Sequence, residues 1–207
     1  MNTTTIDRTK FPRAAEYVER LPNGLLSLTD CLAKRDIYAT AATSFPQLVE
    51  QPMPSQVRDL LRNHDGWAAE SVGTCLSMMI RDFCFDDDAA FREYNKKEVR
   101  ELYRRPTYRM LMLVMSPSLV VMGAAKRWDA FHKGSKLHSG KTSKNALSGR
   151  FEAQLDLEAP EALYPPLTLD VYGDAFVLAI EAAGAKDVAF ERGARDKGRI
   201  PFRLSWT

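Results

Sequence analysis

The sequence predicts an α+β fold in which a helical N-terminal part packs on a C-terminal antiparallel sheet. The first observation is that residues 199–206 alternate between apolar and polar or small side chains, as a half-buried strand does. The inward residues would be Ile200, Phe202, Leu204 and Trp206. The second is that 150–157 alternates in the same way. The third is that apolar residues before 134 recur instead at three- and four-residue steps, which is typical of helices.

Six helices are expected in the N-terminal part. Their ranges are 12–20, 55–63, 67–84, the stretch between the aspartates at 86–88 and the stop at 104–106, 107–115 and 117–134. Pro12, Pro54 and Pro117 stand where prolines open helices, and Gly134 closes the last one. The dense apolar run 107–115 is expected to be a buried helix, and a buried strand is the alternative that its periodicity allows. Residues 25–45 have no clear period.

The C-terminal part begins with the basic, polar stretch 135–147, expected to be a mobile loop or a hairpin. A strand at 150–157 follows, then a helix at 167–183 that ends at Gly184, and strands at 186–191 and 199–206. The chain is therefore expected to be a single domain, 1–207, with a mainly helical part, 1–134, and an α/β part, 135–207.

Composition excludes several classes of protein. The formal charge of +2, from 29 basic and 27 acidic residues, is too balanced to argue for nucleic-acid binding. No apolar run reaches the roughly 18 residues of a spanning helix, and the first residues lack the layout of a secretory signal. A cytoplasmic location is expected. The three cysteines fit neither a disulfide framework nor paired metal ligands, so we interpret them as reduced thiols.

The segment from Gly134 to Thr142 resembles a phosphate-binding loop, but its glycines are separated by five residues where that motif has four. It also follows a helix, whereas a phosphate loop follows a strand and opens a helix. A solvated basic loop is the preferred interpretation. The remaining possibility is that residues 133–150 bind an anionic partner, with Lys136, Lys141 and Lys144 as the anion-binding residues.

On a helix, His132 and Trp128 would share a face, with Arg127 near its edge. One interpretation is structural, with His132 at a helix C-terminus and Trp128 anchoring the helix. The other places His132, Arg127 and Tyr108 at the mouth of a pocket. The structural interpretation is favoured, because no nucleophile or carboxylate adjoins His132 to form a triad. The three histidines are not spaced as metal ligands, so neither a metal nor a cofactor is expected.

The chain resembles the superfamily of heme/nitric-oxide-binding domains, vinyl-reductase-type sensor domains and TRAPP transport subunits, and looks closest to a group of myxobacterial paralogues of unknown function. The resemblance depends on residues 105–109, Ser116-Pro117, 127–134, 172–174 and 202–206. It implies helices packed on an antiparallel sheet, pairing into dimers and an apolar pocket. Heme binding is not implied, because the Tyr-x-Ser-x-Arg element is missing, and the zinc branch would need clustered cysteines.

The expected function is a non-enzymatic module in signalling or scaffolding that binds a small apolar ligand or a protein partner and forms a homodimer. Its expected ligand-binding residues are Tyr108, Arg109, Arg127, Trp128 and His132. The alternative is an enzyme that uses His132 for proton transfer in a pocket. The two differ in the surroundings of His132: backbone partners at a filled helix end favour the module, and an open cavity shared with Arg127 or Tyr108 favours catalysis.

Overall fold

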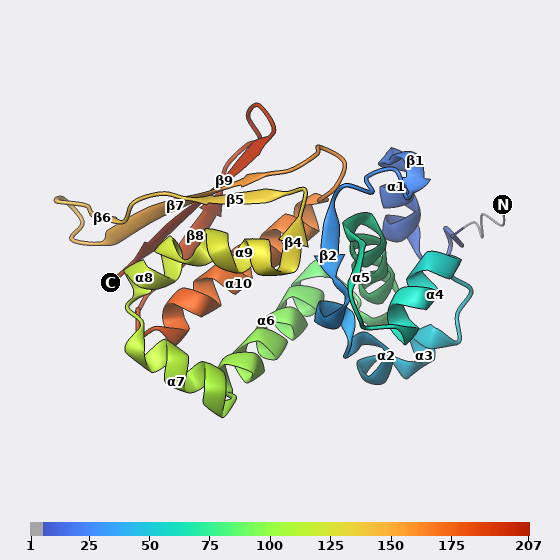
Figure 1. The fold of residues 1–207 in the computed structure, drawn as a ribbon, viewed down its shortest axis with the longest axis horizontal. Coiled ribbons are helices and arrows are strands. Elements are labelled where there is room, and N and C mark those ends of the chain that lie inside the picture. The colour runs from blue at the N-terminus through green and yellow to red at the C-terminus, as the bar shows by residue number, and fades with distance from the viewer. Residues whose placement is uncertain (1–5) are drawn as a thin grey trace. The chain divides into compact units, whose positions relative to one another are not determined.

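The computed structural model of the protein describes residues 6–207, which divide into two compact units (Figure 1). Unit 1 consists of residues 6–91, 131–134 and 160–165, and unit 2 of residues 92–130, 135–159 and 166–207. Helices predominate in the N-terminal half, and the larger antiparallel sheet is C-terminal. The predicted α+β class is confirmed.

Unit 1 is built around one buried helix, α5 (Glu70–Cys84). Its other helical segments are α1 (Pro12–Arg20), the 3-10 turn η1 (Arg35–Tyr38), α2 (Ala41–Ser44), α3 (Pro46–Val49) and α4 (Ser55–Arg62). Helices α1, α3 and α4 all pack against α5. This arrangement follows from the sequence of α5, which is apolar or small on nearly every side and is therefore covered all round.

Unit 1 also contains a small antiparallel sheet with the strand order β3-β2-β4. Its strands are β2 (Leu32–Lys34), β3 (Trp67–Ala69) and β4 (His132–Lys133), and a short strand β1 (Pro22–Leu25) precedes them. Residues 67–69, expected to begin a helix, are instead extended. Their pairing with β2, in which Ala68 lies opposite Ala33, satisfies their backbone, and the helix begins only at Glu70.

Unit 2 contains the larger sheet, with strand order β5-β7-β9-β8 and β6 also paired to β7, all antiparallel. The strands are β5 (Lys136–Ser139), β6 (Ser143–Lys144), β7 (Phe151–Glu158), β8 (Ala189–Arg192) and β9 (Arg199–Trp206). The prediction for β9 is confirmed. Its residues Ile200, Phe202, Leu204 and Trp206 are all buried. Strand β8 begins later than expected, because Asp187 adopts a positive φ of 50° in a turn.

The helices of unit 2 lie on one side of this sheet (Figure 1). They are α6 (Asp88–Arg104), α7 (Pro106–Val114), α8 (Pro117–Met122), α9 (Ala124–Phe131) and α10 (Pro166–Ala182). The first turn of α6 and the last residue of α9 are assigned to unit 1. Helix α10 packs closely on β8, because Gly173 has no side chain: a Cβ there would lie 2.3 Å from the Phe190 ring. None of the described helices is long and apolar enough to cross a membrane.

The prediction of a single helix over 117–134 is wrong in two respects. It is interrupted at Gly123, a residue with low helix propensity, and so forms two helices, α8 and α9. It also ends at Phe131, because His132 and Lys133 are extended and pair with β2 as strand β4. His132 therefore directly follows the last residue of α9 and does not share a helical face with Trp128.

Candidate functional site

His132 lies in unit 1 and is paired with a carboxylate that the sequence did not reveal. Its Nδ1 is 2.7 Å from Oε1 of Glu70, and both side chains are buried. Glu70 is the first residue of α5, and its backbone N–H donates to the carbonyl of Cys31 at 2.8 Å. The pair thus connects strand β4 to the start of α5. The expectation that His132 lacks a carboxylate neighbour is therefore wrong. The sequence did not reveal this neighbour because 62 residues separate the two partners.

The hydroxyl and thiol groups near this pair are held in their neutral forms. Burial raises the pKa of the Tyr17 and Tyr38 hydroxyls well above the usual range, and the charge of Glu70 adds to the effect. Tyr17 donates a hydrogen bond, 3.0 Å long, to the carbonyl of Leu163. Leu163 also belongs to unit 1. Since a nucleophile is activated by a lowered pKa or an adjacent base, neither hydroxyl has the environment of one.

The cysteines give a prediction for the buried part of unit 1. Burial raises the pKa of Cys31 to about 11 and that of Cys75 to about 12, and both side chains are buried, whereas Cys84 is partly exposed. Because the thiolate is the reacting form, we expect an aromatic disulfide reagent to modify Cys84 first and the other two only after unfolding. The Cys84→Ser variant should lose the early reaction. Early release of more than one thiol equivalent would contradict the prediction.

The other four expected ligand-binding residues belong to unit 2. Trp128 is buried, its indole N–H donates to Ser135 Oγ at 3.1 Å, and its ring meets Tyr172 edge-on at 5.1 Å. It is therefore a core anchor, as the structural interpretation held. Tyr108, Arg109 and Arg127 have exposed positions on α7 and α9.

These three exposed residues are near Tyr103, which sequence reasoning missed. Burial raises the pKa of Tyr103, the charge of Arg127 lowers it, and Tyr108 raises it further. Partial burial in turn lowers the pKa of Arg127, which donates to the carbonyl of Val120. Arg109 lines the same hollow as Tyr103. Tyr108, Arg109 and Arg127 are thus brought together within unit 2, and His132 is not among them.

The hollow between α6, α7 and α10 has a volume of about 720 Å³. It is lined by Arg100, Tyr103, Arg104, Arg109, Met112, Leu113, Leu178, Glu181 and Ala182. Three guanidinium groups and one carboxylate therefore surround a partly apolar surface. Such a hollow suits a ligand that carries both negative charge and an apolar part.

A partly buried ion pair connects α6 to α10 beside this hollow. The guanidinium of Arg92 on α6 donates to both carboxylate oxygens of Asp174 on α10, at 2.7 and 2.8 Å. Lys96, one turn further along α6, is 3.8 Å from the same carboxylate. The hydrogen bond to Asp174 raises the pKa of Arg92, which keeps the guanidinium charged.

Helices α7 and α8 carry the main departure from the expected burial. The run 107–115 is indeed helical, but Met110, Leu113 and Val114 are 71%, 74% and 79% exposed, and only Met112 is buried. We define the α7–α8 surface by the exposed apolar residues Met110, Leu111, Leu113, Val114, Leu119 and Met122. Both helices pack on α10. One side of each is covered and the other faces outward, which periodicity could not distinguish.

The basic stretch 135–147 forms an edge of the larger sheet. Strands β5 and β6 both pair with β7, and the N–H of Gly140 between them donates to the carbonyl of Gln154 at 2.8 Å. The stretch is therefore neither a free loop nor a hairpin of its own: β5 and β6 do not pair with each other, and together they form one interrupted edge alongside β7. Lys136 lies opposite Glu158, and Lys144 lies over the Phe151 ring at 5.7 Å. Lys141 borders a hollow of about 630 Å³ that also contains Glu152 and Glu191, so carboxylates offset its charge.

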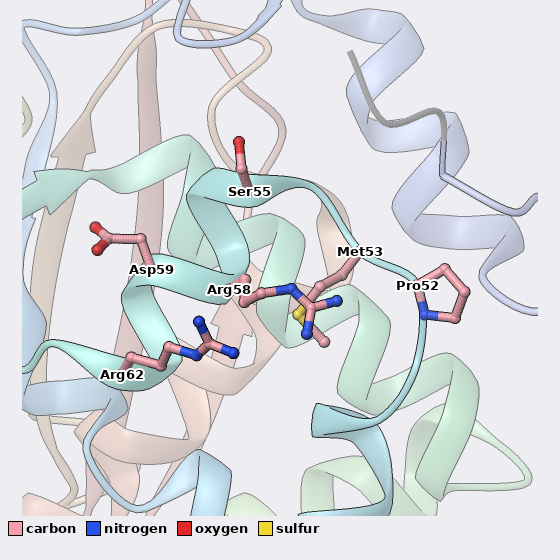
Figure 2. A pocket seen from close by; sticks show the side chains of 6 residues that line it. All are labelled: Pro52, Met53, Ser55, Arg58, Asp59 and Arg62. Carbon is pink, nitrogen blue, oxygen red and sulfur yellow. The ribbon is translucent and has the colours of Figure 1, made fainter. Parts of the chain in front are cut away.

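A further hollow, of about 530 Å³, lies in unit 1 at the start of α4 (Figure 2). It is lined by Pro52, Met53, Ser55, Arg58, Asp59 and Arg62. Arg58 donates to the carbonyls of Val49 and Gln51, and Asp59 accepts from Arg35 at 2.7 Å. These charged groups already stabilise the fold, so we assign no ligand to this hollow.

No protein family, curated protein or solved structure matches this chain. The function must therefore be inferred from the chemistry of its own residues. Within residues 6–207, histidine, cysteine, aspartate and glutamate side chains form no group that could hold a metal ion. The α7–α8 surface carries six exposed apolar side chains, and the hollow beside it is lined by three guanidinium groups.

Proposed function

We propose that the chain is a non-catalytic binding module that contacts its partner through the α7–α8 surface. The observation that supports this is the outward position of Met110, Leu113 and Val114 on a helix whose other side is covered. Contiguous exposed apolar residues commonly mark interaction sites. Burying each of these side chains against a partner would contribute about 1.5–3 kcal/mol.

A small ligand would bind in the adjoining hollow. Met112 and Leu178 supply an apolar lining, while Arg100, Arg104 and Arg109 supply positive charge. This arrangement supports an amphipathic anion as the ligand rather than a purely apolar one. Tyr108 and Arg127, which act on Tyr103 in this hollow, would then influence binding from its rim.

The proposal can be tested without knowing the partner. A photo-reactive benzophenone residue is introduced at Leu113 in cells that produce the protein, and a matched one at Leu147, which is 100% exposed but lies outside the α7–α8 surface. We expect ultraviolet light to yield defined adducts at position 113 and none at 147, because only the first is covered by a partner. Equal labelling at both positions would refute the proposal.

A further inference from the structure

We infer that the α7–α8 surface docks onto the anionic face of a lipid bilayer. This inference rests on the proposed function, because it names the partner of the same surface. Two observations support it independently: the direction in which the apolar residues of α7 point, and the sign of the charges around them.

Helix α7 has the pattern of a helix lying in a membrane interface. Met110, Leu113 and Val114 stand at i, i+3 and i+4 and so form one exposed stripe, while Met112 on the opposite side is the residue that packs inward. Nine residues make a helix far too short to cross a bilayer, which takes about 20. A helix of this kind can lie parallel to the membrane with its apolar stripe among the acyl chains.

Basic side chains outnumber acidic ones around this stripe, although one of them, Arg104, is paired with Glu101 at 2.6 Å. Residues 102–128 contain five basic residues and no acidic one, although the whole chain carries a formal charge of only +2. The five are Arg104, Arg105, Arg109, Lys126 and Arg127. The hollow beside α7 also includes Arg100, and its single carboxylate is Glu181. Basic side chains beside an apolar stripe complement the negative charge of acidic lipids, and each adds to the affinity.

A second copy of the chain fits this surface less well. A symmetric dimer places the same patch on both sides of its interface, so the basic residues of 102–128 would face each other and repel. Single-stranded nucleic acid also fits poorly, because its bases stack on aromatic rings, and Tyr108 is the one aromatic residue on α7. A homodimer, if formed, would use a surface elsewhere.

The inference is tested with the purified full chain and lipid vesicles. One set contains phosphatidylcholine alone, and the other contains phosphatidylcholine mixed with phosphatidylserine. We expect co-sedimentation to show about tenfold or greater preference for the mixed vesicles. The preference should fall at about 1 M salt, where the screening length is about 3 Å. Tryptophan fluorescence of Leu113→Trp should shift to the blue on the mixed vesicles, and that of Leu147→Trp should not.

Two double variants separate the apolar from the electrostatic contribution. Leu113→Glu with Val114→Glu should reduce vesicle binding at least about tenfold, since both residues would be inserted. Arg105→Glu with Arg109→Glu should remove the preference for phosphatidylserine. The matched controls are Leu147→Glu and Lys141→Glu with Lys144→Glu, which should bind as the unmodified chain does. All substituted positions are exposed, so circular dichroism and the thermal midpoint should be unchanged.

The outcomes separate this inference from the proposed function. Equal binding to both vesicle types, or undiminished binding by Leu113→Glu with Val114→Glu, would overturn the membrane inference. Loss of binding only in the variant Lys141→Glu with Lys144→Glu would also overturn it, because the contact would then lie on the basic stretch 135–147. If vesicles are not bound but the benzophenone at position 113 yields a protein adduct, the proposed function stands and the lipid partner is wrong. If position 113 gives no adduct either, both are wrong.

Discussion

Replacing Gly134 by alanine is expected to destabilise unit 1 by about 2–5 kcal/mol. Gly134 has a φ of +78°, which a residue with a Cβ adopts at a cost of about 1–2 kcal/mol. A Cβ at this position would also lie 2.1 Å from the backbone carbonyl oxygen of Asp30 and 2.9 Å from Cα of Cys31. Backbone atoms cannot rotate away as a side chain can, so strand β4 and the segment before β2 must separate.

Gly149 provides the matched control for this prediction. Its φ is +70°, close to that of Gly134, but no atom lies within 4 Å of the position that a Cβ would occupy. Gly149→Ala should therefore show the backbone cost alone, about 1–2 kcal/mol. Both variants are compared with the unmodified chain by urea denaturation followed by circular dichroism. Similar losses in the two variants would show that the close approach to Asp30 has little effect.

Replacing Phe202 by alanine is expected to reduce the free energy of unfolding by about 3–5 kcal/mol. Phe202 is completely buried on β9, opposite Leu155 of β7 and Arg192 of β8. Its ring meets that of Phe176 on α10 edge-on, with 5.4 Å between centroids. The substitution removes the ring that fills the space between the sheet and α10, and the rigid surroundings can close only part of the cavity.

Arg203 serves as the control, because it is the next residue on the same strand and points to the exposed face. Arg203→Ala keeps the backbone pairing with β7 and β8 and should change the free energy of unfolding by no more than about 0.5 kcal/mol. Urea denaturation of the two variants gives the comparison. If Phe202→Ala costs less than about 1 kcal/mol, the terminal strand does not hold α10 as described.

Strand β9 was predictable from the sequence because its alternation is a local property. Residues 199–206 repeat every two positions, and burial of one face follows from that period whatever strand lies alongside. Helix α7 was predictable only in part. A run of apolar residues such as 107–115 indicates a helix or a strand, but it does not reveal which side will be covered, and here the covered side consists mainly of Met112.

The candidate sites were less predictable, because they depend on residues distant in sequence. His132 was singled out as a polar residue at a helix end, but its partner Glu70 lies in another segment and no spacing rule connects them. Arg109 was named as a ligand-binding residue and lines the hollow, whereas Arg100 and Tyr103, which line it too, were missed because they lie on a helix rich in charges. The absence of acidic residues between 102 and 128 was the signal that could have drawn attention to this region.

Unit 1 is assembled from three separate segments of the chain, which affects when it can fold during synthesis. Strand β4 and residues 160–165 belong to this unit, although they are translated long after residues 6–91. On the ribosome, residues 6–91 therefore emerge without a strand that flanks β2 and without the carbonyl that accepts from Tyr17. Unit 1 can complete its folding only after residues 131–134 and 160–165 have been synthesised. Pairings between residues so far apart in sequence also slow folding.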